Sequence, residues 1–309
     1  MTDSCLPSRA LPALKQRYFV LQSSCRRAVH KGNIARAHDL ARRALAVAKS
    51  SGAADLIHRA CTTRSMVYLE MDDVQAACQG LREVVLESAD TEVICRAAFY
   101  LASALRRQKK ISRALFFARK AADKAHELGD PVWEARCDNL LGNIYLNQCY
   151  LDRALTSYQR ALATYRGLEG DHRFPLAIVL DNLGYCLILK DEVHRGLEHL
   201  QEGLHLALAT RDRRTEAELR QDLAHAFLTL RKLPEAQSSA LAALKTAEEN
   251  GYRDIIRNCY YLLGELAMLG GNLEEGDAYF ACLQRFFPDV PHLQRFLRMF
   301  DISSLLTLH

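Results

Sequence analysis

The chain has 309 residues, of which 49% are hydrophobic and 25% are charged, and its formal net charge at pH 7 is +4. These values are ordinary for a folded globular protein. The positive charge is too small to indicate nucleic-acid binding by itself, and no apolar run reaches the roughly 18 residues that span a bilayer. We therefore expect neither a nucleic acid nor a membrane as a partner.

The N-terminal residues 1–11 include Pro7 and are expected to form a loose leader. Helix pairs follow from about Leu14, and the first pair is expected to end near Ser51, just before Gly52. No part of the chain between 12 and 288 has a connection long enough to be a separate domain, so this range is predicted to be one array of helix pairs.

The stretch from Cys137 to Arg166 shows the repeating pattern most clearly. Small residues stand at Gly142, Ala154 and Ala161, and large ones at Leu141, Tyr145 and Tyr158. Two helices can interlock only where one of them lacks bulk, so the small positions predict a closely packed pair. This pattern resembles the tetratricopeptide repeat (TPR), a helix–turn–helix unit whose helices pack through such positions.

The same frame recurs along the chain at intervals of 37 to 42 residues. The positions equivalent to Gly142, which we term anchors, are Cys25, Ser65, Ala102, Gly142, Gly184, Ala224 and Gly264. Twelve residues after each anchor lies a small residue, namely Ala37, Ala77, Ala114, Ala154, Gly196, Ala236 or Gly276. This regularity predicts about seven helix pairs, the first two of which are degenerate because Ser24 and Arg64 replace the usual leucine.

The ends of the second helices are also marked. Gly52, Gly129 and Gly251 each stand 27 residues after an anchor, which predicts a left-handed residue that closes the second helix. Asp55, Asp130 and Asp254 follow closely and could begin the next helix. Two connections differ, since residues 169–175 form a longer one and residues 210–214 contain no glycine.

The C-terminal residues 289–309 form a distinct amphipathic tail. Apolar residues at Leu293, Phe296, Leu297 and Phe300 follow the i, i+3, i+4, i+7 spacing of one helix face. This pattern favours a helix that caps the last pair, as repeat arrays require for solubility. A second apolar set around Leu305 and Leu306 could instead be an interface, so Phe296, Phe300, Leu305 and Leu306 are the possible tail interface.

The period of about 40 residues exceeds the 34 of a minimal TPR. The longer form is similar to the repeats of kinesin light chain, of PINS-type polarity adaptors and of Rap-type bacterial regulators. The resemblance implies an all-α fold, a right-handed α-solenoid of about seven TPR-like helix pairs with a C-terminal capping helix. It also implies that the first helix of each pair lines a concave groove that binds peptides or protein segments.

The family frame assigns the groove residues one by one. The lining positions that we retain as the ligand-binding set are Arg96, Tyr100, Arg136, Asn139, Asn143, Asn147, Asp181, Asn182, Tyr185, Glu218, Asp222 and Glu265. The same frame also gives Arg26, Arg59, Phe99, Arg106, Arg107, Gln221 and Tyr261. Asparagine side chains can donate to and accept from a peptide backbone whatever its sequence, and arginines can hold carboxylates.

Enzyme chemistry is not expected. The sequence has no nucleophile motif and no phosphate loop, and no cofactor is predicted. Several potential metal ligands lie close together at His194, Glu198, His199, Glu202 and His205. His199 is off the face shared by His194 and Glu198, so a tetrahedral zinc site is not expected.

The ten cysteines include no C-x-x-C pair, and most stand within apolar helical patterns, as at Cys95, Cys137 and Cys186. They are interpreted as reduced, buried small hydrophobes, which indicates a cytoplasmic location.

The leading hypothesis is a non-enzymatic adaptor or regulator that binds an extended peptide or protein segment, centred on Asn139, Asn143, Asn182 and Tyr185. One alternative is a scaffold that self-assembles into a homo-oligomer through its apolar tail. Another is a peptide-gated switch, in which the ligand changes the pitch of the solenoid. The sequence separates neither alternative from the adaptor.

Overall fold

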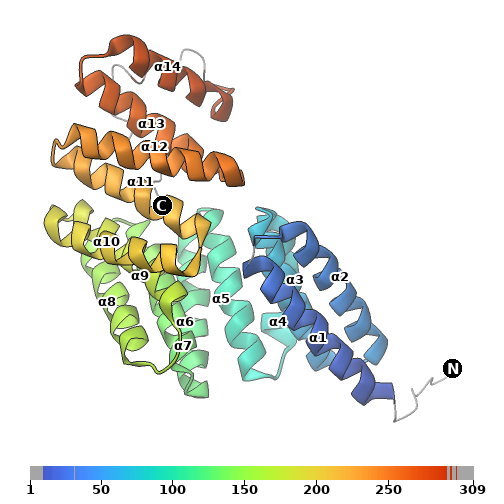
Figure 1. Cartoon of the computed structure of the whole chain (residues 1–309). Coiled ribbons are helices and arrows are strands. Elements are labelled where there is room, and N and C mark those ends of the chain that lie inside the picture. Colours follow the sequence, from blue (N-terminus) through green and yellow to red (C-terminus); the bar gives the residue numbers. More distant parts are fainter. Residues whose placement is uncertain (1–9, 31, 291–292, 294–296, 298–309) are drawn as a thin grey trace. The chain divides into compact units, whose positions relative to one another are not determined.

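A computed structural model describes residues 10–30, 32–290, 293 and 297. This part of the chain contains fourteen α-helices, one short 3-10 helix and no β-strand (Figure 1). The first helices of the pairs are α1 (Ala10–His30), α3 (Ala54–Glu70), α5 (Thr91–Arg107), α7 (Pro131–Leu146), α9 (Arg173–Leu189), α11 (Arg213–Thr229) and α13 (Arg253–Leu269). The second helices are α2 (Ile34–Ser51), α4 (Val74–Glu87), α6 (Ile111–Leu128), α8 (Leu151–Gly167), α10 (Val193–Thr210), α12 (Leu233–Asn250) and α14 (Leu273–Leu283), which η1 (Gln284–Phe286) follows.

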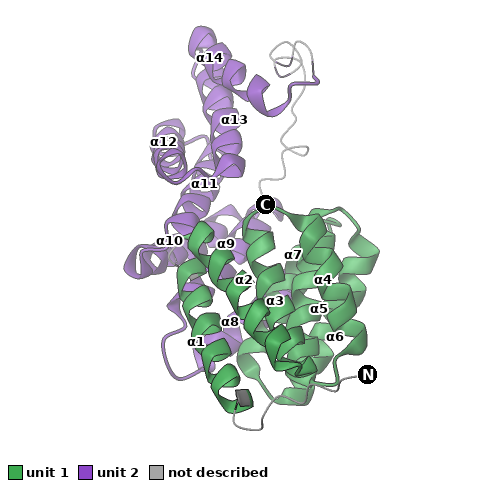
Figure 2. Ribbon diagram, turned by 90° about the vertical axis from the view of Figure 1, so that its right-hand side faces the viewer, with its two compact units in different colours: residues 1–150 green, residues 151–309 purple. Residues whose placement is uncertain are grey.

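The chain divides into two compact units, residues 1–150 and residues 151–309 (Figure 2). In the first unit each helix from α1 to α7 packs against the next one in the chain. In the second unit the same holds from α8 to α14. This order of packing is that of stacked TPR-like helix pairs, so the all-α solenoid class is confirmed.

The predicted register is visible in the turns between the two helices of every pair. Seven residues after each anchor the backbone adopts a positive φ, at Gly32, Asp72, Lys109, Cys149, Asp191, Arg231 and Gly271. Only two of these seven residues are glycine, so the sequence alone does not mark the turn. The repeated conformation confirms seven helix pairs in the predicted frame.

The small residues act as predicted where helices approach closely. A Cβ added to Gly184 would lie 2.7 Å from Leu200 and 3.0 Å from the carbonyl oxygen of Gly196, and one added to Gly196 would lie 2.7 Å from the carbonyl oxygen of Gly184. The backbones of α9 and α10 therefore touch at these two glycines. In the last pair, a Cβ on Gly264 would lie 2.3 Å from the buried Phe280 ring.

Helix ends follow the sequence signals in part, and Asp254 lies inside the first turn of α13 instead of capping it. Gly52, Gly129 and Gly251 take left-handed conformations after α2, α6 and α12. After α10 the equivalent position is Arg211, whose φ of 56° gives the same cap without glycine. Asp130 caps α7 by accepting hydrogen bonds from the backbone N–H groups of the second and third helix residues, whereas Asp55 lies inside the first turn of α3, after the cap position.

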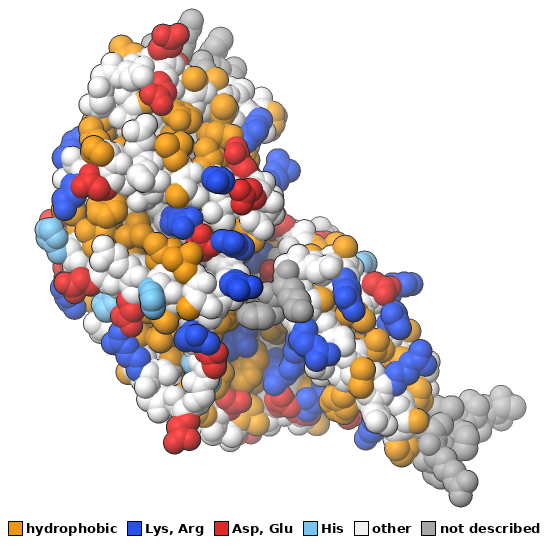
Figure 3. All heavy atoms as spheres, viewed as in Figure 1, with side chains coloured by type: hydrophobic (Ala, Val, Ile, Leu, Met, Phe, Trp, Pro, Cys, Tyr) orange, Lys and Arg blue, Asp and Glu red, His pale blue; other side chains and the backbone are white. Residues whose placement is uncertain are grey.

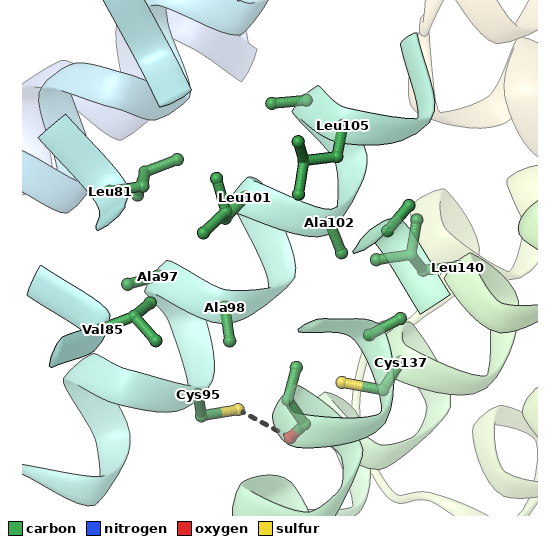
Figure 4. Close-up of a cluster of buried hydrophobic side chains, with 14 of the residues drawn as sticks. Leu81, Val85, Cys95, Ala97, Ala98, Leu101, Ala102, Leu105, Cys137 and Leu140 are labelled. Atoms are coloured by element: carbon green, nitrogen blue, oxygen red, sulfur yellow. Dashed lines mark hydrogen bonds between the residues drawn. The ribbon is translucent and has the colours of Figure 1, made fainter. Parts of the chain in front are cut away.

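Each unit has an apolar core between its helices. In the first unit, Leu101 and Leu105 of α5 are buried among residues of α4, α6 and α7 (Figure 4). The buried thiol of Cys95 donates a hydrogen bond to the carbonyl oxygen of Ala121, with 3.4 Å between Sγ and O. The cysteines within the described residues are free thiols, and six of them are buried, including Cys95, Cys137 and Cys186.

The predicted tail is only partly within the described residues. Leu293 and Leu297 are each 4% exposed and belong to the same apolar core as residues of α13 and α14. These two contacts are those that a capping helix would make. Phe296, Phe300, Leu305 and Leu306 lie outside the described residues, as does the predicted leader up to residue 9, so the tail interface stays a prediction.

Candidate functional site

The first helices of neighbouring pairs contact one another within each unit. In the first unit α3 contacts α1 and α5, and α5 contacts α7. In the second unit α11 contacts α9 and α13. We term these two surfaces the first-helix face of unit 1 (α1, α3, α5 and α7) and the first-helix face of unit 2 (α9, α11 and α13). The predicted lining positions of adjacent repeats therefore lie side by side within each unit.

Arginines and carboxylates meet on the first-helix face of unit 1. Arg59 donates from Nη1 to Glu92 at 2.8 Å and from Nη2 to Asp90 at 2.5 Å. Arg96 pairs with the other oxygen of Glu92. Glu92 therefore bridges an arginine of α3 and an arginine of α5. Glu92 lies outside the lining positions of the family frame, so sequence reasoning did not identify it.

Aromatic side chains support the same arginines. The guanidinium carbon of Arg96 lies 5.4 Å from the ring centroid of Trp133, and that of Arg136 lies 4.4 Å from it. Phe99 packs edge-on against Trp133, with 5.3 Å between ring centroids. Trp133 is 6% exposed and was not predicted as a site residue. Its position three residues before Arg136 places both side chains on the same side of α7, which is the signal that could have identified it.

The predicted asparagines of α7 lie at the other end of the first-helix face of unit 1. Asn139, Asn143 and Asn147 are all partly buried. Asn147 accepts a hydrogen bond from Nη1 of Arg106 at 3.2 Å. Two predicted lining residues from different repeats are thus brought into direct contact.

The predicted residues of unit 2 are less accessible than their assignment to a groove suggests. Asp181, Asn182 and Tyr185 of α9 are 3%, 6% and 8% exposed, and Asp222 of α11 is fully buried. Glu218 remains partly exposed and forms an ion pair with Nε of Arg214 at 2.9 Å. A ligand on this face would first contact the few exposed atoms of these side chains, because their other atoms are buried.

A chain of amide hydrogen bonds connects two first helices of unit 2. Asn258 of α13 donates from Nδ2 to Oε1 of Gln221 at 3.0 Å, and Gln221 donates from Nε2 to Oδ1 of Asp222 at 3.1 Å. Asn258 was not predicted, although it occupies the lining position six residues before the anchor Gly264. The family frame could therefore have identified it.

The electrostatics of this face are those of crowded carboxyl groups. Burial raises the pKa of Asp181 well above its ordinary value, and the nearby carboxylates of Asp222 and Glu218 raise it further. Burial also raises the pKa of the Tyr185 hydroxyl, again with Asp222 contributing. Asp181 is therefore expected to hold its proton in the folded chain at pH values where an exposed aspartate has lost it.

Other kinds of site are not apparent in the part of the chain that the structure describes. These residues include no group of three or more His, Cys, Asp and Glu side chains placed to hold a metal ion. Glu202, from the histidine-rich stretch of α10, instead accepts two hydrogen bonds from Arg166, at 2.8 and 2.7 Å. No helix among the described residues is both long and apolar enough to cross a bilayer.

Several proteins of known structure have a fold similar to that of this chain. The apo form of RapI is similar over 91% of this chain and 98% of its own, with a TM-score of 0.67 and 14% identity. A Rap protein complexed with competence and sporulation factor is similar over 94% and 95%, with a TM-score of 0.66 and 12% identity. The Rap conjugation gene regulator of plasmid pLS20, in complex with the Phr* peptide, is similar over 98% and 82%, with a TM-score of 0.67 and 14% identity.

At these identities the likeness shows a shared fold alone. A search of curated proteins found no match. A family model described as a tetratricopeptide repeat-like domain matches residues 17–185, which is more than half of the sequence. Together with the seven repeated turns, this match shows that the chain belongs to the tetratricopeptide repeat-like family.

Proposed function

We propose that this protein is a non-enzymatic adaptor or regulator that binds an extended peptide or protein segment on its first-helix faces. The main observation behind this proposal is the location of the buried polar side chains. Most of them lie on first helices, namely Gln22, Thr62, Thr63, Ser65, Asp181, Asn182, Thr215, Glu216, Gln221, Asp222 and Asn258. Some of these groups pair with one another, as Gln221 does with Asn258 and Asp222. A surface that served packing alone would need no such polar groups, because their burial is favourable only where they find partners.

The chemistry of these side chains suits a peptide backbone. Amides carry both donors and acceptors, so they can pair with the N–H and C=O groups of an extended chain whatever its sequence. The partly buried Asn139 and Asn143 stand at the edge of such a surface in unit 1, and Asn182 and Tyr185 are the matching candidates in unit 2. Two of the structurally similar Rap proteins are described as complexes, one with a peptide and one with competence and sporulation factor, which supports the same use here.

Selection from a random-peptide library tests the proposal, followed by fluorescence-anisotropy titration of the enriched peptides. We expect the double variant Asn143→Ala/Asn182→Ala to weaken binding about fivefold or more, since it removes one amide from the first-helix face of each unit and a lost hydrogen bond is worth about 1 kcal/mol. The matched control is Gln159→Ala/Gln201→Ala, which removes two exposed amides from the second helices α8 and α10. Absence of any enriched peptide, or equal weakening by both double variants, would contradict the proposal.

A further inference from the structure

Four arginines, one from each first helix, converge on the first-helix face of unit 1. They are Arg26 of α1, Arg59 of α3, Arg96 of α5 and Arg136 of α7. Burial raises the pKa of the Tyr18 hydroxyl, and the positive charges of the first three arginines act in the opposite direction, so all three lie near this one group. Arg96 and Arg136 in turn both lie over the ring of Trp133. Figure 3 shows blue side chains, with some red ones, in the region where these helices lie in Figure 1.

The carboxylates of this cluster do not balance its arginines. Asp90 and Glu92 both form ion pairs with Arg59, and Glu92 also forms one with Arg96. Within the described residues, neither Arg26 nor Arg136 takes part in an ion pair. These four guanidinium groups thus share two carboxylates, which leaves an excess of two positive charges within the cluster itself.

Arg96 stands at the centre of this excess. Its side chain is 21% exposed, and its Nε atom is buried without a hydrogen-bond partner among the described residues. Its pKa is lowered, first by burial and then by the positive charge of Arg26. Like charges held together in a partly desolvated place repel one another, and an incoming anion would relieve that repulsion.

The aromatic residues hold the guanidinium groups in place and do not offer a stacking platform. Trp133 is 6% exposed, and its ring is covered by Arg96 and Arg136 and met edge-on by Phe99. Binding of single-stranded nucleic acid uses open aromatic faces on which bases stack. The arrangement therefore favours carboxylate recognition, in which an arginine offers two parallel donors.

On the basis of the proposed function, we propose that the first-helix face of unit 1 binds an acidic extended segment of a partner protein, whose carboxylates pair with Arg26, Arg96 and Arg136. The spacing of the helices suits such a ligand. Packed helices lie about 8–10 Å apart. A polyproline II chain rises about 9 Å over three residues and returns each third side chain to one face. Carboxylates at every third residue would therefore meet successive first helices.

The test uses the full chain and a labelled peptide of about nine residues with glutamate at every third position. A second peptide carries glutamine at those positions, and a mixed-sequence single-stranded oligonucleotide of equal charge is the third probe. The test variant is Arg26→Gln/Arg136→Gln, with Arg26→Gln alone as the variant least able to disturb packing because this side chain is exposed. The matched control Arg82→Gln/Arg113→Gln removes two exposed arginines from the second helices α4 and α6.

We expect the glutamate peptide to bind about tenfold or more tightly than the glutamine peptide, and to lose affinity when salt is raised from about 0.05 to about 0.5 M. Arg26→Gln and the double variant should weaken it, and Arg82→Gln/Arg113→Gln should not. Glu92→Gln should act in the opposite direction and strengthen binding, because it removes the internal competitor for Arg59 and Arg96.

Four results would overturn the inference. Equal binding of the two peptides, or full binding by Arg26→Gln/Arg136→Gln, would show that the arginines are not the recognition element, while the proposed function would stand because a peptide still binds. Tighter binding of the oligonucleotide, weakened by the same variants, would reassign the face to nucleic acid. Failure of both peptides and of a random-peptide library to bind would overturn this inference and the proposed function together.

Discussion

At the scale of single residues, the repeat is set by positions where a methyl group does not fit. A Cβ at Gly264 would lie 2.3 to 2.9 Å from three atoms of the Phe280 ring, and this ring is fully buried. We expect Gly264→Ala to lower the free energy of unfolding by about 2 kcal/mol, as overpacked cores do. Urea denaturation followed by circular dichroism measures it. Gly167→Ala is the control, because nothing lies within 4 Å of its added Cβ and alanine favours the helix.

A second residue-scale prediction concerns Asp181. Burial, with the charges of Asp222 and Glu218, raises its folded pKa well above the ordinary 3.8. The folded chain therefore keeps a proton that the unfolded chain loses, so the stability that this carboxyl contributes is present below about pH 3.8 and declines as the pH rises toward the folded pKa. Asp181→Asn keeps the side chain neutral, so we expect the variant to be more stable than the wild type at neutral pH.

Urea denaturation of Asp181→Asn and of the wild type between about pH 4 and pH 8 checks the sign of this effect. The stability difference between Asp181→Asn and the wild type should shrink as the pH falls, because the wild-type carboxyl then becomes neutral as well. Asp289→Asn, at an exposed position, should follow the wild type throughout. A difference for Asp181→Asn that does not change with pH would contradict the assigned cause.

The candidate residues show which features of the site the family frame can predict and which it cannot. It assigned Arg59, Arg96 and Arg136 to equivalent positions of successive first helices, and they lie on α3, α5 and α7, because such positions depend only on helix periodicity. It could not tell that Asp181 and Asp222 are buried, since burial depends on how tightly adjacent helices approach. It also missed Glu92 and Trp133, which reach the face from outside the lining positions. Both act through contacts with arginines from other positions or helices, and a single helix pattern does not encode such contacts.

At the scale of elements, the turn inside five of the seven pairs holds a non-glycine residue in the left-handed conformation, which costs conformational free energy. Arg231 has a φ of 58° between α11 and α12, where Gly32 and Gly271 occupy the equivalent turns of other repeats. A non-glycine residue in the left-handed region costs about 1–2 kcal/mol. Replacing it with glycine removes this strain but also raises the entropy of the unfolded chain, which offsets part of the stabilisation. We expect Arg231→Gly to raise the free energy of unfolding by about 0.5–1 kcal/mol.

Alanine separates the two possible reasons for that gain. Arg231→Ala removes the same exposed side chain but keeps the Cβ and its strain, so its stability should stay close to that of the wild type. Both variants are measured by urea denaturation. Equal stabilisation by alanine and glycine would assign the effect to the lost arginine side chain and not to the backbone.

The three glycine-closed helix ends were predicted correctly, and the reason is physical. A left-handed closing residue strongly favours glycine, so Gly52, Gly129 and Gly251 could be found by spacing alone. Arg211 closes α10 in the same conformation but carries no such mark. The prediction succeeded where the chain uses the residue of lowest strain, and it offered no closing residue for α10, where a non-glycine residue takes the same conformation.

At the scale of the whole molecule, stability should be local, because each helix pair packs chiefly on its neighbours. Within unit 2, α13 contacts α11, α12 and α14, and repeat arrays of this kind gain stability from nearest-neighbour interfaces. A lesion at Gly264 should therefore loosen α13 and α14 first. It should leave α1 and α2, whose core is a separate cluster around Tyr18 and Leu56, unchanged.

Amide hydrogen exchange with mass spectrometry measures this directly. For Gly264→Ala we expect faster exchange in peptides from α12 to α14 and wild-type exchange in peptides from α1 to α4, since exchange reports the free energy of the smallest opening that exposes each amide. Gly167→Ala should change neither region. Faster exchange of equal size in all fourteen helices would contradict the local view. It would mean that the described helices open as one cooperative body, so that a ligand bound to the first helices of one unit would stabilise the entire chain.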